Sequence, residues 1–244
     1  MEAKARIYSR YVTARNERIV PERLEGLASR APYLKRLIRR WFPTDRAASI
    51  LELGCGHGAL IHFAGELGYH NIRGVDASGE QIAEAERLGV PGVAQGDLLE
   101  TLSACKTDST DLVIAFDVIE HFRKDELLEL ADNVFRVLKP GGRWIIHAPN
   151  AESPFGARIR YGDFTHELAF TRASVGQLLL SSGFAKVECF EDEPVPHGLK
   201  SAIRWILWKL FRKLAVFWLV VETGVIRDNY ILSQNLLAVA EKGR

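Results

Sequence analysis

The chain has little cysteine: only Cys55, Cys105 and Cys189 occur among its 244 residues. They lie far apart in or beside apolar segments, and none has the spacing of zinc ligands. An odd number of cysteines also argues against a disulfide framework. We therefore predict a reducing, cytoplasmic environment and no metal site.

Long apolar runs are missing as well. No run approaches the roughly 20 residues that span a bilayer, and residues 1–18 are charged throughout, so we expect neither a membrane-spanning helix nor a signal peptide. Repeats and low-complexity tracts are absent too. With 47% hydrophobic and 26% charged residues, the composition fits one sizeable folded domain with room for an added helical segment.

A strong net charge is also lacking, since the formal value is +1. Residues 1–46 nevertheless carry twelve Lys or Arg against five Asp or Glu, which leaves twenty basic and twenty-six acidic residues for the remainder. A cationic arm can attract phosphates, anionic lipids or an acidic polymer, or it can be a solvated helical face.

What is present is an alternation of strand and helix patterns after a helical region at residues 5–42, which Pro21 and Pro32 interrupt. The expected strands are 49–53, 71–76, 92–95, 111–116, 143–148, 185–191 and 236–241. The expected helices are 59–67, 79–88, 124–138 and 171–182, the third ended by Pro140, Gly141 and Gly142. The pattern predicts a doubly wound α/β fold with a seven-stranded, mostly parallel sheet. We divide the chain into an N-terminal helical arm (1–46) and a body (47–244) that carries a helical insertion (194–230).

The most informative motif is Leu51-Glu52-Leu53-Gly54-Cys55-Gly56-His57-Gly58, where a buried strand turns into a helix. Glycine lacks a Cβ, so the backbone can turn sharply and a ligand can approach it. The Gly-x-Gly-x-Gly spacing is tighter than the dinucleotide fingerprint and favours a nucleoside without a pyrophosphate. Alone, the motif could be only a tight turn.

Acidic residues stand at the ends of the next three strands: Asp76, Asp97 and Asp117. A carboxylate at such a position can accept hydrogen bonds from ribose hydroxyls or from an exocyclic amine. Each could instead cap the following helix. Their combination with the glycine turn favours a nucleoside site.

With these residues, the sequence resembles the class I S-adenosylmethionine-dependent methyltransferases, a Rossmann-like fold. The resemblance rests on the glycine motif, on Gly74-Val75-Asp76, Gly96-Asp97 and Phe116-Asp117-Val118-Ile119-Glu120-His121, and on Arg136-Val137-Leu138-Lys139-Pro140-Gly141-Gly142. It covers about residues 47–191, and Leu236–Lys242 looks like the family's last, antiparallel strand. The implied cofactor is S-adenosylmethionine. The implied cofactor residues are Glu52, Gly54, Cys55, Gly56, Asp76, Ala77, Gly96, Asp97, Phe116 and Asp117.

A hydroxyl acceptor must lose its proton as it attacks, and histidine suits this near neutral pH. The candidates are His121, His147 and His166. We expect His147 to be buried, and His121 to be structural or on the cofactor side. His166 ranks first because its loop, 150–170, lines the acceptor pocket in relatives; bracing of the next helix is the alternative. From this loop we predict Asn150, Arg158, Tyr161 and His166 as substrate-binding residues, with Arg160 as a further polar side chain.

The second unusual segment, His197–Gly224, has the periodicity of an amphipathic helix. One apolar arc is predicted, made of Ile203, Ile206, Leu207, Leu210, Leu214, Phe217, Trp218 and Val221. Lys209, Arg212 and Lys213 lie opposite. Such a basic, aromatic-rich helix is typical of peripheral membrane contact, here through residues 198–222 at the inner membrane face. The alternatives are a homodimer interface and a lid over the active site.

The loop and this helix together are similar to methyltransferases of bacterial surface-polysaccharide biosynthesis. This second resemblance implies O-methylation of a sugar or glycan hydroxyl. A prenylated quinone or another lipid is the alternative acceptor, and a non-catalytic cofactor-binding scaffold is the alternative outside enzymes. We expect no nucleic-acid substrate, because Asp117-Val118-Ile119-Glu120 stands where base-amine methyltransferases carry Asn-Pro-Pro-aromatic.

Overall fold

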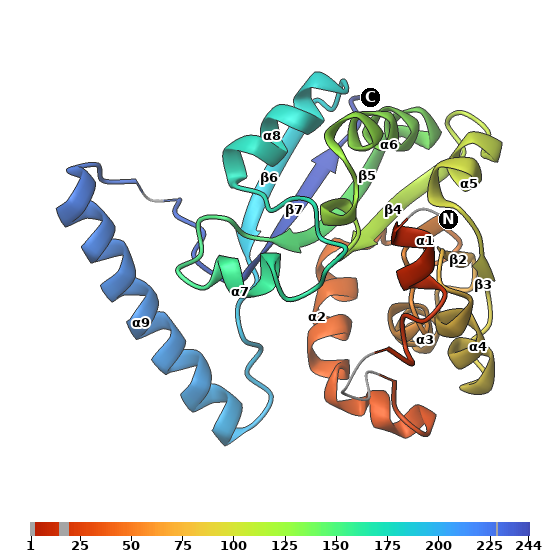
Figure 1. Cartoon of the computed structure of the whole chain (residues 1–244), viewed down its shortest axis with the longest axis horizontal. Helices are drawn as coiled ribbons and strands as arrows, with labels where there is room; N and C mark the ends of the chain where they lie inside the picture. The colour runs from red at the N-terminus through yellow and green to blue at the C-terminus, as the bar shows by residue number, and fades with distance from the viewer. Residues whose placement is uncertain (1–2, 15–19, 228) are drawn as a thin grey trace.

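In the computed structural model, which describes residues 3–14, 20–227 and 229–244, seven strands form one sheet in the order β3-β2-β1-β4-β5-β7-β6 (Figure 1). Only β7 is antiparallel to its neighbours, β5 and β6. The strands are β1 (Ile50–Leu53), β2 (Ile72–Asp76), β3 (Val93–Gln95), β4 (Thr110–Phe116), β5 (Leu138–Pro149), β6 (Lys186–Glu191) and β7 (Asn235–Glu241). The predicted seven-stranded, mostly parallel sheet is confirmed.

Helices cover both faces of this sheet. They are α1 (Ala3–Tyr8), α2 (Ala31–Trp41), α3 (Ala59–Glu66), α4 (Gly79–Arg87), α5 (Leu98–Ala104), α6 (Lys124–Val137), α7 (Gly156–Arg160), α8 (Arg172–Ser181) and α9 (Leu199–Thr223), with short 3-10 helices η1 (Leu24–Ser29) and η2 (Ile119–His121). The buried residues of α5, α6 and α8 share one core cluster, and those of α2, α3 and α4 share the other.

The central strands contribute to both cores because side chains alternate across a sheet. Along β4, Val113 and Ala115 belong to the first cluster, whereas Leu112 and Ile114 belong to the second. A strand buried on both faces reads as an unbroken apolar run, which is why these strands were recognisable.

The structure differs from the prediction at a strand boundary and in a helix that was not predicted. The Pro140-Gly141-Gly142 stretch does not form a loop between helix and strand; it belongs to β5, which starts at Leu138 opposite Thr110. The pairing register shifts between Thr110 and Leu112, so the extra residues are taken up as a bulge-like irregularity. Helix α5 was not predicted at all, because its seven residues are too few to establish a helical period.

The N-terminal arm is not one interrupted helix. Pro32 lies in the first turn of α2, where its missing N–H costs nothing, so it starts this helix rather than breaking one. Residues 15–19, part of the predicted helical region, lie outside the described residues. Leu34, Leu37 and Ile38 of α2 are buried in the same cluster as Ile50 of β1. The arm is therefore packed into the core of the body at this point.

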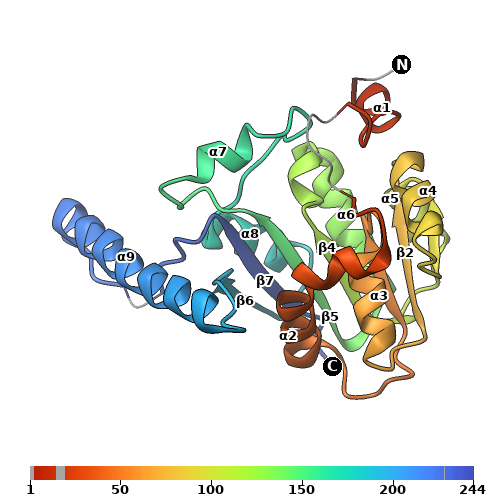
Figure 2. The same cartoon turned by 90° about the horizontal axis from the view of Figure 1, so that it is seen from below.

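Helix α9 confirms the predicted helix and projects from the body at the β6 edge of the sheet (Figures 1 and 2). Ser201 is its one buried residue. Every member of the predicted apolar arc is exposed, with Trp218 at 70%. Within the described ranges, none of the helices has the length and apolar character needed to cross a bilayer.

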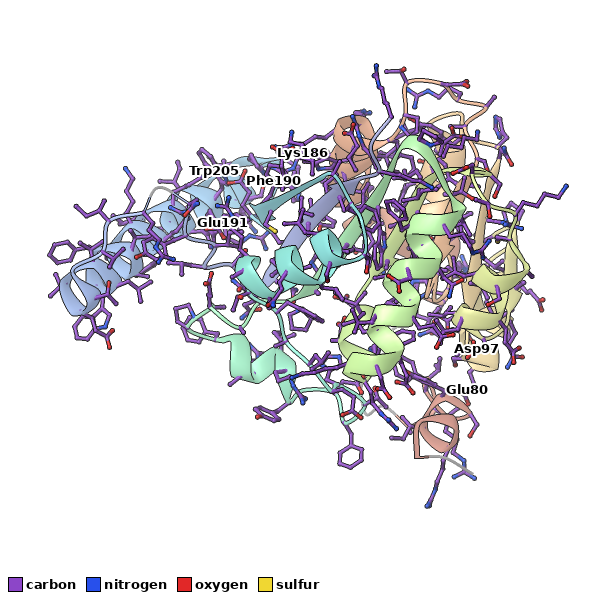
Figure 3. The ribbon with its side chains drawn as sticks, turned by 90° about the horizontal axis from the view of Figure 1, so that it is seen from above. Glu80, Asp97, Lys186, Phe190, Glu191 and Trp205 are labelled. Atoms are coloured by element: carbon purple, nitrogen blue, oxygen red, sulfur yellow. The ribbon has the colours of Figure 1, made fainter. Side chains whose placement is uncertain are left out.

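The polar side of α9 faces the body. Arg212 Nε lies 2.5 Å from Glu191 Oε1, and Lys209 Nζ lies 2.7 Å from Glu193 Oε2. Figure 3 shows Glu191, Phe190 and Trp205 together where β6 meets this helix. These charges therefore bind the body of the protein, and it is the apolar side that is turned outward.

Candidate functional site

The glycine motif forms the turn between β1 and α3. Gly54, Gly56 and Gly58 have φ values of 67°, 53° and 77°, a left-handed conformation that side chains disfavour. A Cβ at Gly54 would also overlap Cγ2 of Val118. The N–H groups of Gly54 and Cys55 donate to the carbonyl of Val75 at 2.8 and 3.1 Å, which ties the turn to β2. The expectation that this turn needs glycine is thus explained by both conformation and space.

Asp76, at the end of β2, organises the next part of the site. Its Oδ2 accepts from Gly56 N and its Oδ1 from Ser78 N, both at 2.8 Å. Burial raises the pKa of Asp76, while these two hydrogen bonds counteract the shift because they favour the carboxylate. The carboxylate therefore links the glycine turn to the start of α4.

A cavity of about 990 Å³ opens along the carboxyl ends of β1, β2, β3 and β4. All ten predicted cofactor residues line it: Glu52, Gly54, Cys55, Gly56, Asp76, Ala77, Gly96, Asp97, Phe116 and Asp117. The sheet topology gathers them because parallel strands end at one edge, which is where open sheets bind ligands.

Two of these residues also serve the fold. Asp97 Oδ1 accepts from Glu100 N at 3.0 Å and caps α5, so the helix-capping alternative is realised. Glu52 is buried below the glycine turn, and its Oε2 is without a hydrogen-bond partner among the described residues. Burial raises the pKa of Glu52 to about 8, against the opposing effect of Arg30.

Asp117 is joined to a histidine behind the strand ends. His147 Nδ1 lies 2.7 Å from Asp117 Oδ1, and its Nε2 lies 3.2 Å from Asp192 Oδ2. Burial lowers the pKa of His147, but the two carboxylates outweigh it and raise the pKa well above the ordinary value. His147 is buried, as expected, and bridges the carboxylates of Asp117 and Asp192. Asp192 was not foreseen, because it follows β6 far along the chain.

The N-terminal arm supplies another part of the cavity wall, through Tyr8, Ser9 and Tyr11. The Glu80 carboxylate at the start of α4 holds it there by accepting from Val12 N, Thr13 N and Thr13 Oγ1 at 2.7–3.1 Å. Figure 3 shows Glu80 beside the N-terminal segment. Sequence reasoning missed this contribution, because no local pattern marks a distant segment that folds over a site. It also missed three other lining residues, Arg30, Gln81 and His57, although His57 stands inside the glycine motif.

Three side chains converge beside the cavity: Glu120, His121 and His166. The rings of His121 and His166 are 4.7 Å apart, and His166 Nε2 lies 3.8 Å from Glu120 Oε1. His121 lines the cavity, whereas His166 contacts His121 and does not line the cavity. Burial and the nearby His166 lower the pKa of His121 to about 4, so this imidazole is neutral near pH 7.

Hydrogen bonds fix both rings. His166 Nδ1 donates to Ile159 O at 3.0 Å. His121 Nδ1 lies 2.8 Å from Thr165 Oγ1, which itself donates to Asp163 Oδ1 at 2.6 Å. Since the threonine hydroxyl uses its proton on Asp163, His121 is the donor in its own pair. In the neutral form of each ring, Nε2 is thus the nitrogen with a lone pair.

The other predicted substrate residues lie elsewhere in the loop. Asn150 is fully buried; its Nδ2 donates to Ile231 O and Ser233 O, and its Oδ1 accepts from Glu152 N. The structure therefore corrects its assignment as a substrate contact, since its amide is used inside the fold. Arg158 and Tyr161 are exposed, Tyr161 at 78%, and neither lines the cavity. Arg160 donates to the carbonyls of His166 and Glu167, which shapes the loop.

Comparisons with known proteins agree with this geometry. A family model described as a methyltransferase domain matches residues 27–189. A probable S-adenosylmethionine-dependent methyltransferase of Mycolicibacterium smegmatis is 26% identical over 172 residues, which cover 69% of this chain and 63% of that relative's length. The chain thus spans less than two thirds of this relative.

Solved structures share the fold. A methyltransferase from Archaeoglobus fulgidus superposes with a TM-score of 0.65 and 23% identity, over 90% of this chain and all of that chain. Phosphoethanolamine N-methyltransferase 2 of Haemonchus contortus, in complex with S-adenosyl-L-methionine, gives a TM-score of 0.60 and 19% identity, over 98% of this chain and 56% of that chain.

The residues present fit S-adenosylmethionine. The cavity is large enough for a nucleoside with an amino-acid arm. Gly54 and Gly56 both line the cavity, and the carboxylates of Asp76 and Asp97 can accept hydrogen bonds from hydroxyl and amine groups. The chain therefore belongs to the methyltransferase-domain family, with the class I fold and S-adenosylmethionine as its cofactor.

Proposed function

We propose that the chain is an O-methyltransferase that methylates a hydroxyl group of a sugar or glycan. When bound, S-adenosylmethionine supplies an electrophilic methyl group, so the protein must position the acceptor and handle one proton. The observation that carries the proposal is the Glu120, His121 and His166 cluster at the wall of the cofactor cavity.

A hydroxyl acceptor needs such a cluster, since its proton must leave as the oxygen attacks. His121 reaches the cavity. Its Nδ1 is hydrogen-bonded to Thr165, which in turn donates to Asp163, and this holds the ring in one tautomer. His166 stands next to it with Nε2 available. In this proposal His166 is the candidate general base, and His121 lies on the route between it and the cavity.

The loop 150–170 supports a polar acceptor. Its backbone is anchored on the cluster, because the N–H groups of Glu167 and Leu168 donate to the carbonyl of Glu120 at 2.7 and 3.0 Å. Its exposed face carries Arg158, Tyr161 and Phe164. Aromatic and guanidinium groups of this kind suit the apolar faces and hydroxyls of a sugar.

A lipid or prenylated-quinone acceptor is the second candidate, favoured by the outward apolar side of α9. That surface would bring the protein to the inner face of a membrane, where lipid-linked acceptors lie. A lipid-linked glycan would satisfy both observations.

The test is a screen of nucleotide sugars, glycans and quinones with isotopically labelled S-adenosylmethionine, read by mass spectrometry. A labelled O-methyl sugar supports the proposal, and labelling of quinones alone supports the second candidate. Failure to bind either S-adenosylmethionine or its demethylated product would rule out both enzyme candidates.

A further inference from the structure

The least satisfied group near the cavity is the Glu120 carboxylate. Glu120 is 0% exposed, and neither of its oxygens has a hydrogen-bond partner among the described residues. A buried carboxylate without partners is costly, since an uncompensated charge loses its hydration. Such a group in a folded protein calls for an explanation, such as an ion that binds there.

Its neighbours are suited to a cation. One donor atom each from Glu120, His121 and His166 lies within 4.8 Å of the other two. Two imidazole nitrogens with a carboxylate oxygen are a ligand set that holds divalent transition metals and leaves further positions open. Donors on tetrahedral bonds of about 2.1 Å are about 3.4 Å apart, so metal binding would bring these atoms closer by up to about 1.4 Å.

The surroundings of both rings match those of metal-binding histidines. In metal sites the second ring nitrogen usually donates to a carbonyl or to a group linked to a carboxylate, which fixes the ring and raises its basicity. Here His166 donates to Ile159 O, and His121 donates to Thr165, which is bonded to Asp163. The outer hydrogen bonds of a metal site are therefore already in place.

We propose that Glu120, His121 and His166 bind one divalent transition-metal cation at the wall of the cofactor cavity. This goes beyond the sequence, which predicted no metal. Glu120 and His121 are adjacent in η2 and His166 is 45 residues later, so no compact ligand spacing exists to be recognised. The binding site itself does not depend on the identity of the acceptor.

The cation would deepen the proposed function if that function holds. A bound cation would hold the acceptor hydroxyl and favour its deprotonation, because the positive charge stabilises the alkoxide, and the proton would pass to bulk water. His166 would then be a ligand rather than a free base.

The experiment uses untagged protein that has been treated with EDTA and exchanged into metal-free buffer. Co²⁺ is titrated and followed by visible absorption, and Zn²⁺ by calorimetry. We expect one equivalent of either ion to bind. Glu120→Gln and His166→Ala should weaken binding by about 100-fold or more, since even outer-shell changes cost 10–100-fold. His70→Ala is the control, because His70 is exposed in the connection between α3 and β2 and should leave binding unchanged.

Glu120→Gln preserves shape, and its melting temperature shows whether it is folded. Zn²⁺ should raise the melting temperature of the unaltered protein and not that of this variant. Each of three results would overturn the site: absence of saturable binding, binding by both variants as tight as by the unaltered protein, or a Co²⁺–thiolate absorption band from cysteine. Methyl transfer that persists in EDTA without metal binding would overturn it and keep the proposed function. Metal binding without methyl transfer to any hydroxyl would keep the metal site and overturn the proposed function.

Discussion

Nδ1 of His147 lies 2.7 Å from Oδ1 of Asp117, so a buried histidine of the sheet is bonded to a carboxylate of the cofactor cavity. The same ring contacts Asp192 through Nε2. This bridge joins the end of β4 to the segment after β6, on either side of β5 and β7. His147 therefore connects a residue that lines the cavity to a segment on the far side of the sheet's last strands.

The first prediction concerns pH. The pKa of His147 is raised in the folded state, so its contribution to stability is fully present below the unfolded pKa of about 6.5 and is lost as pH rises through the folded pKa. The pKa of Asp117 is affected first by burial, which raises it, but the His147 charge outweighs this and lowers it overall. Its contribution is therefore lost only under strong acid, as pH falls through the folded pKa.

His147→Gln should lower the free energy of unfolding by about 1–3 kcal/mol at pH 6, the cost of leaving buried polar groups unpaired. The loss should shrink towards pH 9. Urea unfolding at several pH values measures it, with the exposed His70→Ala as the matched variant. A loss that does not change with pH would show that His147 is neutral in the folded protein.

The second prediction concerns the glycine turn. Gly54→Ala places a Cβ against Val118 in a left-handed conformation, and strain of this kind costs about 1–3 kcal/mol. If the turn shifts to relieve it, affinity for S-adenosylhomocysteine should fall about 10–100-fold in calorimetry.

Gly65→Ala is its control. Gly65 lies inside α3, and an added Cβ there would meet nothing within 4 Å. Affinity should be unchanged, and stability should rise by up to about 1 kcal/mol because alanine favours the helix. Equal affinities of Gly54→Ala and Gly65→Ala for S-adenosylhomocysteine would show that the shape of the glycine turn does not determine cofactor binding.

The third prediction concerns the arm. Glu80→Ala removes the acceptor for Val12 N and for the amide and hydroxyl of Thr13. We expect faster trypsin cleavage at Arg10 and several-fold weaker binding of S-adenosylhomocysteine, since Tyr8 and Tyr11 would leave the cavity wall.

Glu86→Ala on the same helix is the comparison, because Glu86 is exposed and distant from the arm's hydrogen bonds. If both variants are cleaved at the rate of the unaltered protein, the arm is held by contacts other than Glu80.

The fourth prediction concerns proton removal. His166→Ala should reduce turnover about 10²–10⁴-fold while S-adenosylhomocysteine affinity stays nearly intact, because His166 does not line the cofactor cavity. Single-turnover assays with the acceptor found in the screen measure it. Near-normal turnover would remove His166 from the mechanism, whether as base or as ligand.

The fifth prediction concerns α9. Phe217→Ser with Trp218→Ser removes two of its most exposed apolar side chains and should abolish co-sedimentation with vesicles that contain anionic lipid. Leu128→Ser, at an exposed position of α6, is the control. Equal sedimentation of all three proteins rejects membrane contact. A change from dimer to monomer in light scattering would instead identify a second copy as the partner of this face.

The sequence predicted the features that depend on local pattern, namely the buried strands and the carboxylates at the strand ends. Buried strands such as Thr110–Phe116 read as apolar runs, and carboxylates at the strand ends meet at one edge by topology alone. The ten predicted cofactor residues therefore line one cavity.

Contacts between segments that are far apart in the chain could not be predicted from the sequence. The partner of Asp117 is His147, whose outer nitrogen bonds Asp192, and no spacing in the chain relates these three residues. Glu80 and Thr13 are related only through the fold. Asn150 shows the opposite error: a polar residue at a strand end suggested a ligand contact, but its amide satisfies backbone carbonyls.

The position of the α9 insertion between β6 and β7 makes its length easy to change. In the register of β6 and β7, Glu191 stands opposite Leu236, so the chain leaves the sheet and re-enters it at neighbouring points. A segment whose ends already meet can be lengthened, shortened or exchanged at little cost to the sheet, because loop closure depends only weakly on length. The length of this insertion can therefore change without changing the pairing of β6 with β7.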